Sequence, residues 1–451
     1  MRIAYLSHFY PPTHNSGIEQ YTHGLAKGML EAGHSVAVLC VNRWSEGETY
    51  WQGFTDDEWE GVSVRRFNVN CFRSPAPNRY YYDNPELADH VRDFLLEYKP
   101  DLVHIASMYT LSARIIKVAK ELDLPVVFTL SDFWAICPRH TLMRYDGSLC
   151  DAQVPPQVCQ DCLLSESSGY RALKHLLPFS LTETIYNRLV GYSEIAGYIP
   201  GMKRWGMDVV ERRRILKQYL PMIDATLAPS QFMRDTTLAA GLPVQIEVSH
   251  HGNDLGWLSD YKPRPSDGEL HFGYIGQISP IKGLHLLIEA FQRNQFQDHV
   301  KLHIYGNLEA NPAYVEKLRQ LAGQNHNIEL MGPFLRHELP RVLADIDALV
   351  APSIWPEVAG LVVQEAFAAK IPVLASDMGG LPEFVRPGAG GLLFGIDNPE
   401  ELQQTLATVV AGGMNLLDDL RATIPAVRTV DDERQYIESV YANLLSSKVL
   451  S

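Results

Sequence analysis

Two glutamates, Glu357 and Glu365, have the type and spacing of residues that could do chemistry on a bound ligand. Seven residues separate them in the stretch PEVAGLVVQE, residues 356–365. A proline and a glycine flank Glu357 and are poor helix-interior residues, so we expect Glu357 to lie in a loop. The apolar run of residues 361–369 predicts a helix, with Glu365 about one turn inside it.

This arrangement would suit a ligand that carries both phosphates and hydroxyls. The N-terminus of a helix presents free N–H groups and a positive dipole end to an anion. Glu357 precedes that anion site and Glu365 lies just inside it, so both carboxylates could accept hydrogen bonds from hydroxyls. A ligand with a sugar, a diphosphate and a ribose fits this description. Two glutamates on a solvated surface are the alternative, which the pair alone does not exclude.

The length and composition indicate a multidomain globular protein without a nucleic-acid partner. Its 451 residues predict two to three domains, and 46% hydrophobic with 20% charged residues is ordinary for such a protein. The formal net charge of −14 argues against general nucleic-acid binding. Residues 1–8 hold too short an apolar run for a signal peptide, and no apolar stretch approaches membrane-spanning length. We therefore expect a cytoplasmic protein, with peripheral binding at the inner face of the cell membrane left open.

Short apolar runs alternate with helix-like segments, which predicts parallel βαβ units. The expected strands fall into a first and a second series along the chain, and residues 224–230 resemble a strand and turn near the junction of the two. The expected buried strands are residues 3–6, 36–40, 102–105 and 126–130, then 272–275, 302–305, 328–331, 348–350, 373–375 and 392–394. The fold class is therefore predicted to be α/β, with two Rossmann-like doubly wound domains. Because open α/β sheets bind ligands outside the carboxyl ends of their strands, we expect the domains to face an interdomain cleft.

Three glycine-containing loops follow expected strands and supply further candidate residues. After the strand at 272–275, Gly276 would let the backbone approach a ligand, and Lys282 would place a charge beside a diphosphate. Residues 377–383, DMGGLPE, lead into a helix with an acidic first turn. Gly17 lies in the loop FYPPTHNSGIE after the first strand. Taken singly, each loop is equally consistent with an ordinary turn or surface loop.

The ordered set of these segments resembles the retaining glycosyltransferases of family 4, the glycosyl transferases group 1, which have the two-domain GT-B fold. The resemblance covers nearly the whole chain. Single motifs are weak, whereas the ordered series is specific. The matching segments are the Pro-Pro…Gly loop near the start, GLA…GHSV at 24–36, PDLVH at 100–104, APS at 228–230, G…KG at 276–283, YG at 305–306, the glutamate pair with GL at 360–361, and PV…GGLPE at 372–383.

The resemblance implies a role for each residue of a donor site. Glu365 would hold the ribose hydroxyls, Glu357 would contact the transferred sugar, and Lys282 would neutralise the diphosphate leaving group. Residues 332–334 would line the base pocket. The other candidate donor-binding residues are Gly17, Gly276, Gln277, Gly332, Pro333, Phe334, Gly360, Leu361 and Val362.

The implied reaction moves a sugar from a nucleotide-sugar donor, a UDP- or GDP-sugar, to a hydroxyl with retention of anomeric configuration. The family needs no divalent metal, which is consistent with a lysine and a helix N-terminus stabilising the phosphate charge. The departing phosphate would help to deprotonate the acceptor, so no protein nucleophile is expected. The acceptor would be a saccharide or a lipid-linked molecule, in the biosynthesis of a polysaccharide, lipopolysaccharide or glycolipid.

The resemblance also implies the domain boundaries. An acceptor-side Rossmann-like domain would cover residues 1–220, with a Cys-rich loop at 137–162 and a helical insert at 163–220. A donor-binding domain would cover residues 221–431. The C-terminal helix at 432–447 would return to complete the first domain.

Three departures from the family pattern leave the reaction open in part. Many members carry Arg at the position of Gln277 and His at the position of Ser131, and the usual Gly-Phe after the first glutamate is here Val358-Ala359. Ser131 and its neighbour Asp132 are nevertheless candidate catalytic residues. A non-catalytic nucleotide-sugar or glycan-binding protein on the same scaffold is one alternative, and a phosphorylase or epimerase is another.

Four clustered cysteines form a second candidate site. Cys137, Cys150, Cys159 and Cys162 have the spacing C-x12-C-x8-C-x2-C. Four thiolates with a terminal C-x-x-C suit a tetrahedral metal, most simply structural zinc. Four free thiols, or two disulfides in an oxidising compartment, are the alternatives.

A basic, helix-like stretch interrupts the otherwise acidic chain. It comprises MKRW at residues 202–205 and RRRILK at residues 212–217. Contact with an anionic membrane would suit a lipid-linked acceptor. A solvated helix face explains the stretch equally well.

Overall fold

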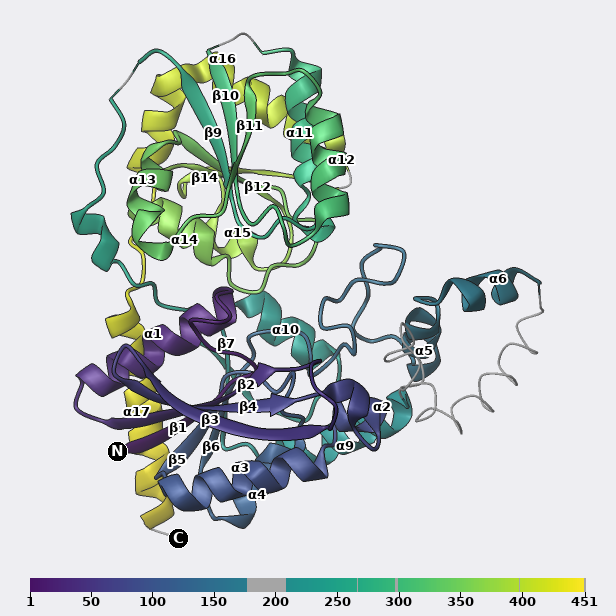
Figure 1. Ribbon diagram of the computed structural model, residues 1–451. Coiled ribbons are helices and arrows are strands. Elements are labelled where there is room, and N and C mark those ends of the chain that lie inside the picture. The colour runs from purple at the N-terminus through teal and green to yellow at the C-terminus, as the bar shows by residue number, and fades with distance from the viewer. Residues whose placement is uncertain (177–207, 266, 297–298, 397, 450–451) are drawn as a thin grey trace. The chain divides into compact units, whose positions relative to one another are not determined.

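The computed structural model describes residues 1–176, 208–265, 267–296, 299–396 and 398–449 (Figure 1). The chain forms two compact units. The first unit contains Met1–His250 together with Asp431–Ser451, and the second contains His251–Val430. Each unit is built on its own largely parallel sheet covered by helices, as the prediction of two α/β domains requires.

The sheet of the first unit has the strand order β3-β4-β2-β1-β5-β6-β7-β8. All neighbours are parallel except β3 and β4, which form an antiparallel hairpin. Its strands are β1 Arg2–Leu6, β2 Ser35–Arg43, β3 Trp51–Trp59, β4 Val62–Val69, β5 Leu102–Ile105, β6 Val126–Thr129, β7 Ala225–Ala228 and β8 Ile246–Val248. Its helices are α1 Gly17–Glu31, α2 Pro77–Tyr80, α3 Pro85–Tyr98, α4 Arg114–Glu121, α5 Pro156–Leu164, α6 Ser168–Leu176, α9 Val209–Tyr219, α10 Gln231–Ala239 and α17 Val430–Val449.

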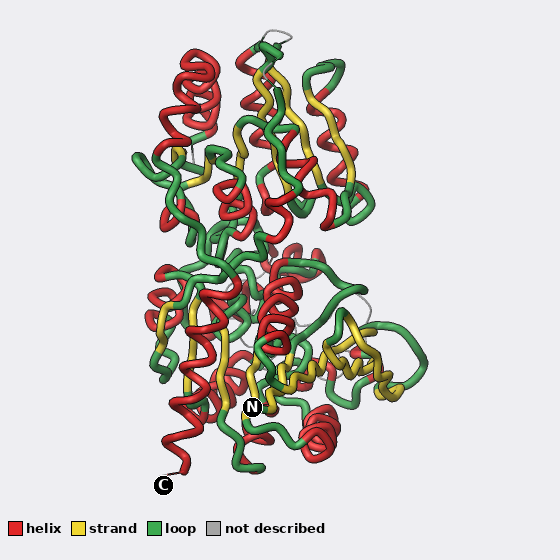
Figure 2. The backbone as a smooth tube through the Cα atoms, turned by 90° about the vertical axis from the view of Figure 1, so that its left-hand side faces the viewer, coloured by secondary structure: helices red, strands yellow, loops and turns green. Residues whose placement is uncertain are grey.

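The central strands β1, β5 and β6 are short apolar runs because helices cover both of their faces. Residues of β5 and β6 are buried throughout. The C-terminal helix α17 joins this core: the Tyr441 hydroxyl lies 2.5 Å from His104 Nδ1 and 3.1 Å from the Tyr5 hydroxyl. Figure 2 shows α17 running beside the strands of the first unit toward the end marked C.

The first unit extends further along the chain than the predicted boundary at residue 220. Strand β7 pairs with β6, and β8 pairs with β7, so residues up to His250 belong to this sheet. Strands β3, β4 and β8 were not predicted from the sequence. Strand β3 is mostly exposed and β8 has three residues, so neither has the continuous apolar run that marks a buried strand. Of the expected helical insert, α6 and α9 are helical, and residues 177–207 lie outside the described residues.

The second unit has a six-stranded sheet in the order β11-β10-β9-β12-β13-β14, parallel throughout. Relative to chain order this is 3-2-1-4-5-6, so the order reverses between β9 and β12. Figure 1 shows α11 and α12 on one side of the sheet and α13 and α14 on the other. The strands are β9 Leu270–Ile275, β10 Val300–Tyr305, β11 Ile328–Gly332, β12 Ala348–Ala351, β13 Val373–Ser376 and β14 Gly391–Phe394. The helices are α11 Leu284–Asn294, α12 Pro312–Ala322, α13 Leu339–Ala344, α14 Leu361–Ala368, α15 Leu381–Phe384 and α16 Pro399–Ala422.

Every strand expected in the second series is present, within one or two residues of its predicted bounds. Each is a run of four to six residues, and all but β11 are buried or largely buried, which is why the apolar pattern located them. In β11 only Ile328 and Gly332 are buried. Among the helices of the described residues, none combines the length and the apolar character needed to cross a bilayer.

Candidate functional site

The reversal point of the second sheet brings Lys282 and Glu357 together. Lys282 ends a short 3-10 turn after β9, and Glu357 lies in the loop after β12. The Lys282 Nζ is 2.5 Å from Glu357 Oε1. Both side chains are largely buried, with 20% and 15% of their surfaces exposed. Because ligands of open α/β sheets bind at such reversal points, this pair occupies the expected place for a binding site.

Hydrogen bonds within its own loop and from the end of β13 and the loop that follows it hold Glu357 in position. The Ser353 hydroxyl lies 2.5 Å from Glu357 Oε1 and donates to it. The Ser376 hydroxyl at the end of β13 donates to the Ser353 carbonyl at 2.7 Å. The Gly380 N–H donates to the Glu357 carbonyl at 2.7 Å. A carboxylate anchored in this way keeps its position when the ligand changes charge, which is what electrostatic catalysis requires.

Two glycines allow the three loops to approach one another. Gly283 has φ +71°, and a Cβ there would lie 1.8 Å from the Pro352 carbonyl oxygen. Gly379 has φ +63°, and its Cβ would lie 2.5 Å from the Glu357 backbone nitrogen. The loops therefore pack backbone against backbone at the carboxyl ends of β9, β12 and β13, which only glycine permits.

Helix α14 begins at Leu361, as the sequence predicts, and its N-terminus adjoins the Glu357 loop. Gly360 is the N-cap in a left-handed conformation with φ 57°, and it has no side chain with which to cap the first amides of the helix. The amides of Leu361 and Val362 belong to this first turn, where N–H groups and the dipole favour an anion. Glu365 lies one turn further along, as predicted.

Glu365 forms an ion pair with Arg336. The carboxylate is largely buried, with 14% of its side chain exposed, whereas the Arg336 side chain is 41% exposed. Arg336 is not among the site residues predicted from the sequence. Its proximity to the candidate segment Gly332-Pro333-Phe334 was the only signal that could have suggested it, and a charged residue in an exposed loop is ordinary.

The remaining donor-site candidates of the second unit line the same edge of the sheet. The Gly306 N–H after β10 donates to the Gly332 carbonyl at 2.9 Å, and Phe334 packs edge-on against Tyr305 with ring centroids 6.1 Å apart. The Tyr274 hydroxyl donates to the Gln277 carbonyl at 2.8 Å, which fixes the backbone of that loop. Gly276 and Gln277 are themselves exposed. Trp355 lies beside Lys282, whose Nζ is 5.2 Å from the ring centroid.

In the first unit, Ser131 and Asp132 follow β6 at the carboxyl edge of the sheet. The Trp134 N–H donates to Asp132 Oδ1 at 2.8 Å. Burial nevertheless raises the pKa of Asp132 above its ordinary value. The Ser131 hydroxyl is partly buried and lies 3.5 Å from the Thr129 carbonyl oxygen, too far for a strong hydrogen bond.

A buried pair, His8 and Glu19, lies at the first-unit reversal point, where β1 neighbours β5. His8 Nε2 is 3.2 Å from Glu19 Oε1, and the Ser16 N–H donates to Glu19 Oε2 at 2.9 Å. Burial acts to raise the pKa of Glu19, but the His8 and Ser16 hydrogen bonds lower it to about 2. Gly17, a predicted site residue, is the exposed first residue of α1 beside this pair. His8 and Glu19 are not among the predicted site residues, because a lone His and Glu near a helix start carry no distinctive pattern.

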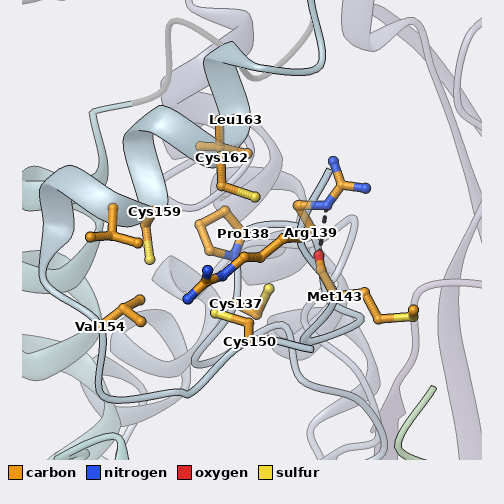
Figure 3. Close-up of a pocket in the computed structure, with 11 residues that line it drawn as sticks. Cys137, Pro138, Arg139, Met143, Cys150, Val154, Cys159, Cys162 and Leu163 are labelled. Atoms are coloured by element: carbon orange, nitrogen blue, oxygen red, sulfur yellow. Dashed lines mark hydrogen bonds between the residues drawn. The ribbon is translucent and has the colours of Figure 1, made fainter. Parts of the chain in front are cut away.

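The four clustered cysteines line one pocket of the first unit, together with side chains of the same loop and of α5 (Figure 3). No disulfide joins any of these four cysteines. The predicted basic surface is wrong for Arg212, because its side chain is buried and packs against Trp134. Arg213 is also engaged, donating to the Val154 carbonyl at 2.8 Å. The other half of that stretch, residues 202–205, lies outside the described residues.

Two models of known protein families match this chain. A family model described as "Glycosyl transferase 4-like domain" matches residues 16–252, more than half of the 451-residue chain. The chain belongs to this glycosyltransferase family. A second model, "Glycosyl transferases group 1", matches residues 259–424 of the glycosyltransferase, the region that holds the Lys282–Glu357 pair.

Individual relatives of the glycosyltransferase agree with this assignment. D-inositol 3-phosphate glycosyltransferase of Corynebacterium efficiens is 32% identical over 223 residues, which cover 46% of this chain. The match spans 50% of that relative's length. Sucrose-phosphate synthase from Thermosynechococcus elongatus aligns with a TM-score of 0.67 at 15% identity, covering 99% of this chain and 100% of that one. The Anabaena HepE complex with UDP-glucose gives a TM-score of 0.63 at 19% identity, covering 99% and 100%. The glycosyltransferase therefore has the GT-B fold.

Proposed function

We propose that this glycosyltransferase transfers a sugar from a nucleotide-sugar donor to a hydroxyl acceptor with retention of anomeric configuration. The observation that carries the proposal is the Lys282–Glu357 contact at the reversal point of the second sheet, next to the start of α14. A cation, a carboxylate and a helix N-terminus are the groups that a sugar diphosphate needs for recognition.

Each group has one role in the proposed reaction. Lys282 and the first amides of α14 stabilise the negative charge that develops on the departing phosphate. Glu357 accepts hydrogen bonds from hydroxyls of the transferred sugar, and Glu365 accepts them from the ribose. The departing phosphate takes the acceptor proton, so the reaction uses no protein nucleophile. No divalent metal is required in this scheme, because cationic and amide groups supply the charge stabilisation.

The donor is proposed to be a UDP-sugar, with a GDP-sugar as the second candidate. The Anabaena structure, a complex with UDP-glucose, supports the first choice. Residues 332–334 would contact the base, and Arg336 places a guanidinium beside them. Ser131 and Asp132 are proposed to contact the acceptor, a saccharide or lipid-linked hydroxyl compound in the biosynthesis of a cell-surface polysaccharide or glycolipid.

The test begins with a donor screen. UDP, GDP, ADP and dTDP are added separately to the full chain and the melting temperature is followed. A nucleotide at 100 times its Kd stabilises the fold by about 2.7 kcal/mol, which a melting curve detects. The corresponding nucleotide sugars are then incubated with candidate acceptors, and release of the free nucleotide is measured.

The outcomes separate the candidate functions. Nucleotide release that depends on a hydroxyl acceptor supports transfer, and the anomeric signal of the product in NMR reports retention. Binding without release under any acceptor would support a nucleotide-sugar-binding protein. Release that requires inorganic phosphate would indicate a phosphorylase, and an isomerised free nucleotide sugar would indicate an epimerase. Each of the last three results would overturn the proposal.

A further inference from the structure

The pocket of the four cysteines is assembled from three segments whose backbones are fixed independently. Cys137 follows β6, and its N–H donates to the Phe133 carbonyl at 2.7 Å. Cys150 closes a tight hairpin, and its N–H donates to the Leu142 carbonyl at 2.8 Å. Cys159 and Cys162 are three residues apart on α5 and therefore lie on one face of that helix. Figure 3 shows the two α5 thiols on the side of the helix that faces the loop of Cys137 and Cys150.

Arginines lie in and around this pocket: Arg139, which lines it, pairs with Glu166, whereas Arg212 and Arg213 are held by other groups. Arg212 is 1% exposed, and its guanidinium donates to the Trp134 carbonyl. Arg213 donates to Cys159 Sγ at 3.2 Å as well as to the Val154 carbonyl. Within the described parts of the chain, neither arginine forms an ion pair with a carboxylate. A buried guanidinium is costly unless a negative charge compensates it.

We propose that Cys137, Cys150, Cys159 and Cys162 bind one structural zinc ion. Each thiol releases its proton to water on binding, so four thiolates and Zn²⁺ carry a net charge of −2. That charge would offset Arg212 and Arg213. The N–H···S hydrogen bond from Arg213 to Cys159 is the kind of outer contact that orients a metal-bound thiolate. Neutral thiols would leave both arginines without a compensating charge.

Zinc binding would require the thiols to move closer together. Zn–S bonds are about 2.3 Å long and tetrahedral, so bound sulfurs lie on the order of 4 Å apart. Among the described residues, the only His, Cys, Asp or Glu group with three ligand atoms mutually within 4.8 Å is Asp267, Glu269 and His271, so the cysteines do not reach this spacing. The bound ion would then fix the loop at residues 137–162, which begins five residues after Asp132.

The site would be structural and not catalytic. Four thiolates leave no open coordination position for a substrate or an activated water. This inference is therefore independent of the proposed sugar transfer. A glycosyltransferase without zinc, or a zinc protein without transferase activity, would each be a clear and distinguishable result.

The first experiment measures metal content of the full chain, expressed with added zinc and purified without chelators under reducing conditions. We expect one zinc per chain by elemental mass spectrometry, released when a mercurial reagent titrates the thiols. Replacement by Co²⁺ should give the absorption bands of a tetrahedral tetrathiolate. Substoichiometric zinc with all six thiols freely titrating in the denatured protein would overturn the proposal. A mass lowered by loss of thiol hydrogens would overturn it in favour of disulfides.

Cysteine variants within and outside the cluster distinguish loss of the metal site from a general effect of replacing a cysteine. Cys159→Ser with Cys162→Ser should lose the ion, whereas Cys71→Ser, which changes a buried cysteine elsewhere in the first unit, should keep it. Cys159→His should retain zinc, because imidazole is also a zinc ligand.

Two arginine variants, one of them a control, test the hydrogen bond from Arg213 to Cys159. Arg213→Ala should lower zinc affinity about 10-fold to 100-fold in competition with a chromogenic chelator. Arg214→Ala removes the neighbouring arginine, which is 60% exposed and pairs with Glu211, and should leave the affinity unchanged. Equal affinities for the two arginine variants would contradict the role given to Arg213. Retention of zinc by the double cysteine variant would overturn the site itself.

Discussion

The Lys282 ammonium lies 2.5 Å from the Glu357 carboxylate, although the two residues are 75 positions apart in the chain. The two residues follow β9 and β12, the neighbouring strands between which the order of the second sheet reverses. Ser353 donates to the same carboxylate oxygen, so Glu357 is held from two directions. In the proposed reaction the lysine faces the phosphate and the glutamate faces the sugar, and their contact sets the distance between these two parts of the donor.

Glu357→Gln should lower kcat by a factor on the order of 10² to 10³, because it removes a fixed charge from the reacting centre. The melting temperature should stay close to that of wild type, since an amide preserves the shape and can still accept the Ser353 hydrogen bond. Steady-state kinetics with the donor found in the screen give kcat, and calorimetry gives the melting temperature. Glu316→Gln, on α12, is the control and should behave as wild type. An unchanged kcat in Glu357→Gln would remove the role assigned to this residue.

Lys282→Ala should weaken binding of the nucleoside diphosphate and also lower kcat, because it removes a charge that acts on the leaving group. The fold loss of kcat/KM in the double variant Lys282→Ala with Glu357→Gln should be smaller than the product of the losses in the two single variants, since the two residues contact each other. A double-mutant cycle on kcat/KM measures this coupling. Strict additivity of the two free-energy changes would show that the 2.5 Å contact has no functional consequence.

Glu365→Gln should reduce the discrimination between ribose and deoxyribose nucleotides. The proposed hydrogen bonds to the ribose hydroxyls contribute about 1.5–3 kcal/mol when the acceptor is charged, or roughly 10-fold to 150-fold in affinity. Isothermal titration should therefore show wild type preferring UDP over 2′-deoxy-UDP, and the variant binding both with similar, weaker affinity. If the variant keeps the wild-type preference, Glu365 does not bind the ribose. Arg336→Ala removes the guanidinium paired with Glu365 and tests whether that contact orients the carboxylate.

Gly283→Ala should destabilise the second unit more than a glycine replacement in open space. A Cβ at Gly283 would lie 1.8 Å from the Pro352 carbonyl oxygen, whereas a Cβ at Gly388 would meet no atom within 4 Å. Both glycines have positive φ, at +71° and +78°, so both alanine variants lose about 1–2 kcal/mol from backbone strain. Gly283→Ala should lose a further 1–3 kcal/mol, roughly, from displacement of the loop. Urea denaturation compares them, and equal losses would contradict the close packing.

Glu19 should make the stability of the first unit depend on acid pH. The pKa of its carboxylate is lowered in the fold from 4.5 to about 2. The charged form is therefore stabilised by folding: its contribution is present above about pH 4.5 and is lost as the pH falls toward 2. The shift corresponds to roughly 3 kcal/mol. Glu19→Gln should lower the free energy of unfolding at pH 7 and flatten its decline between pH 5 and 2.

The control for this pH dependence is Glu31→Gln, at the exposed end of the same helix. It should leave the wild-type pH profile in place. Urea denaturation at pH 7, 5 and 3 distinguishes the two variants. If the free energy of unfolding of Glu19→Gln falls with pH as steeply as that of wild type, another carboxylate dominates the acid transition.

Local sequence patterns predicted the α/β class, most of the buried strands and the place of the helix that carries Glu365, but not the largely buried strand β4. These features follow from local composition: a parallel strand buried on both faces is a short apolar run, and a helix start is marked by its flanking residues. The order of motifs along the chain was also sufficient to indicate the glycosyltransferase family. Exposed or very short strands such as β3 and β8 lack that local pattern and went unrecognised.

Which distant side chains touch one another could be learned from the folded chain alone. The partners of Glu357 and Glu365, namely Lys282, Ser353 and Arg336, depend on strand order and loop packing, which no local pattern encodes. The same reason explains Arg212: its place in the RRR run predicted a surface charge, yet the fold buries it against Trp134 beside the cysteine loop. Burial is a property of the packed chain, because it is set by residues that arrive from elsewhere in the sequence.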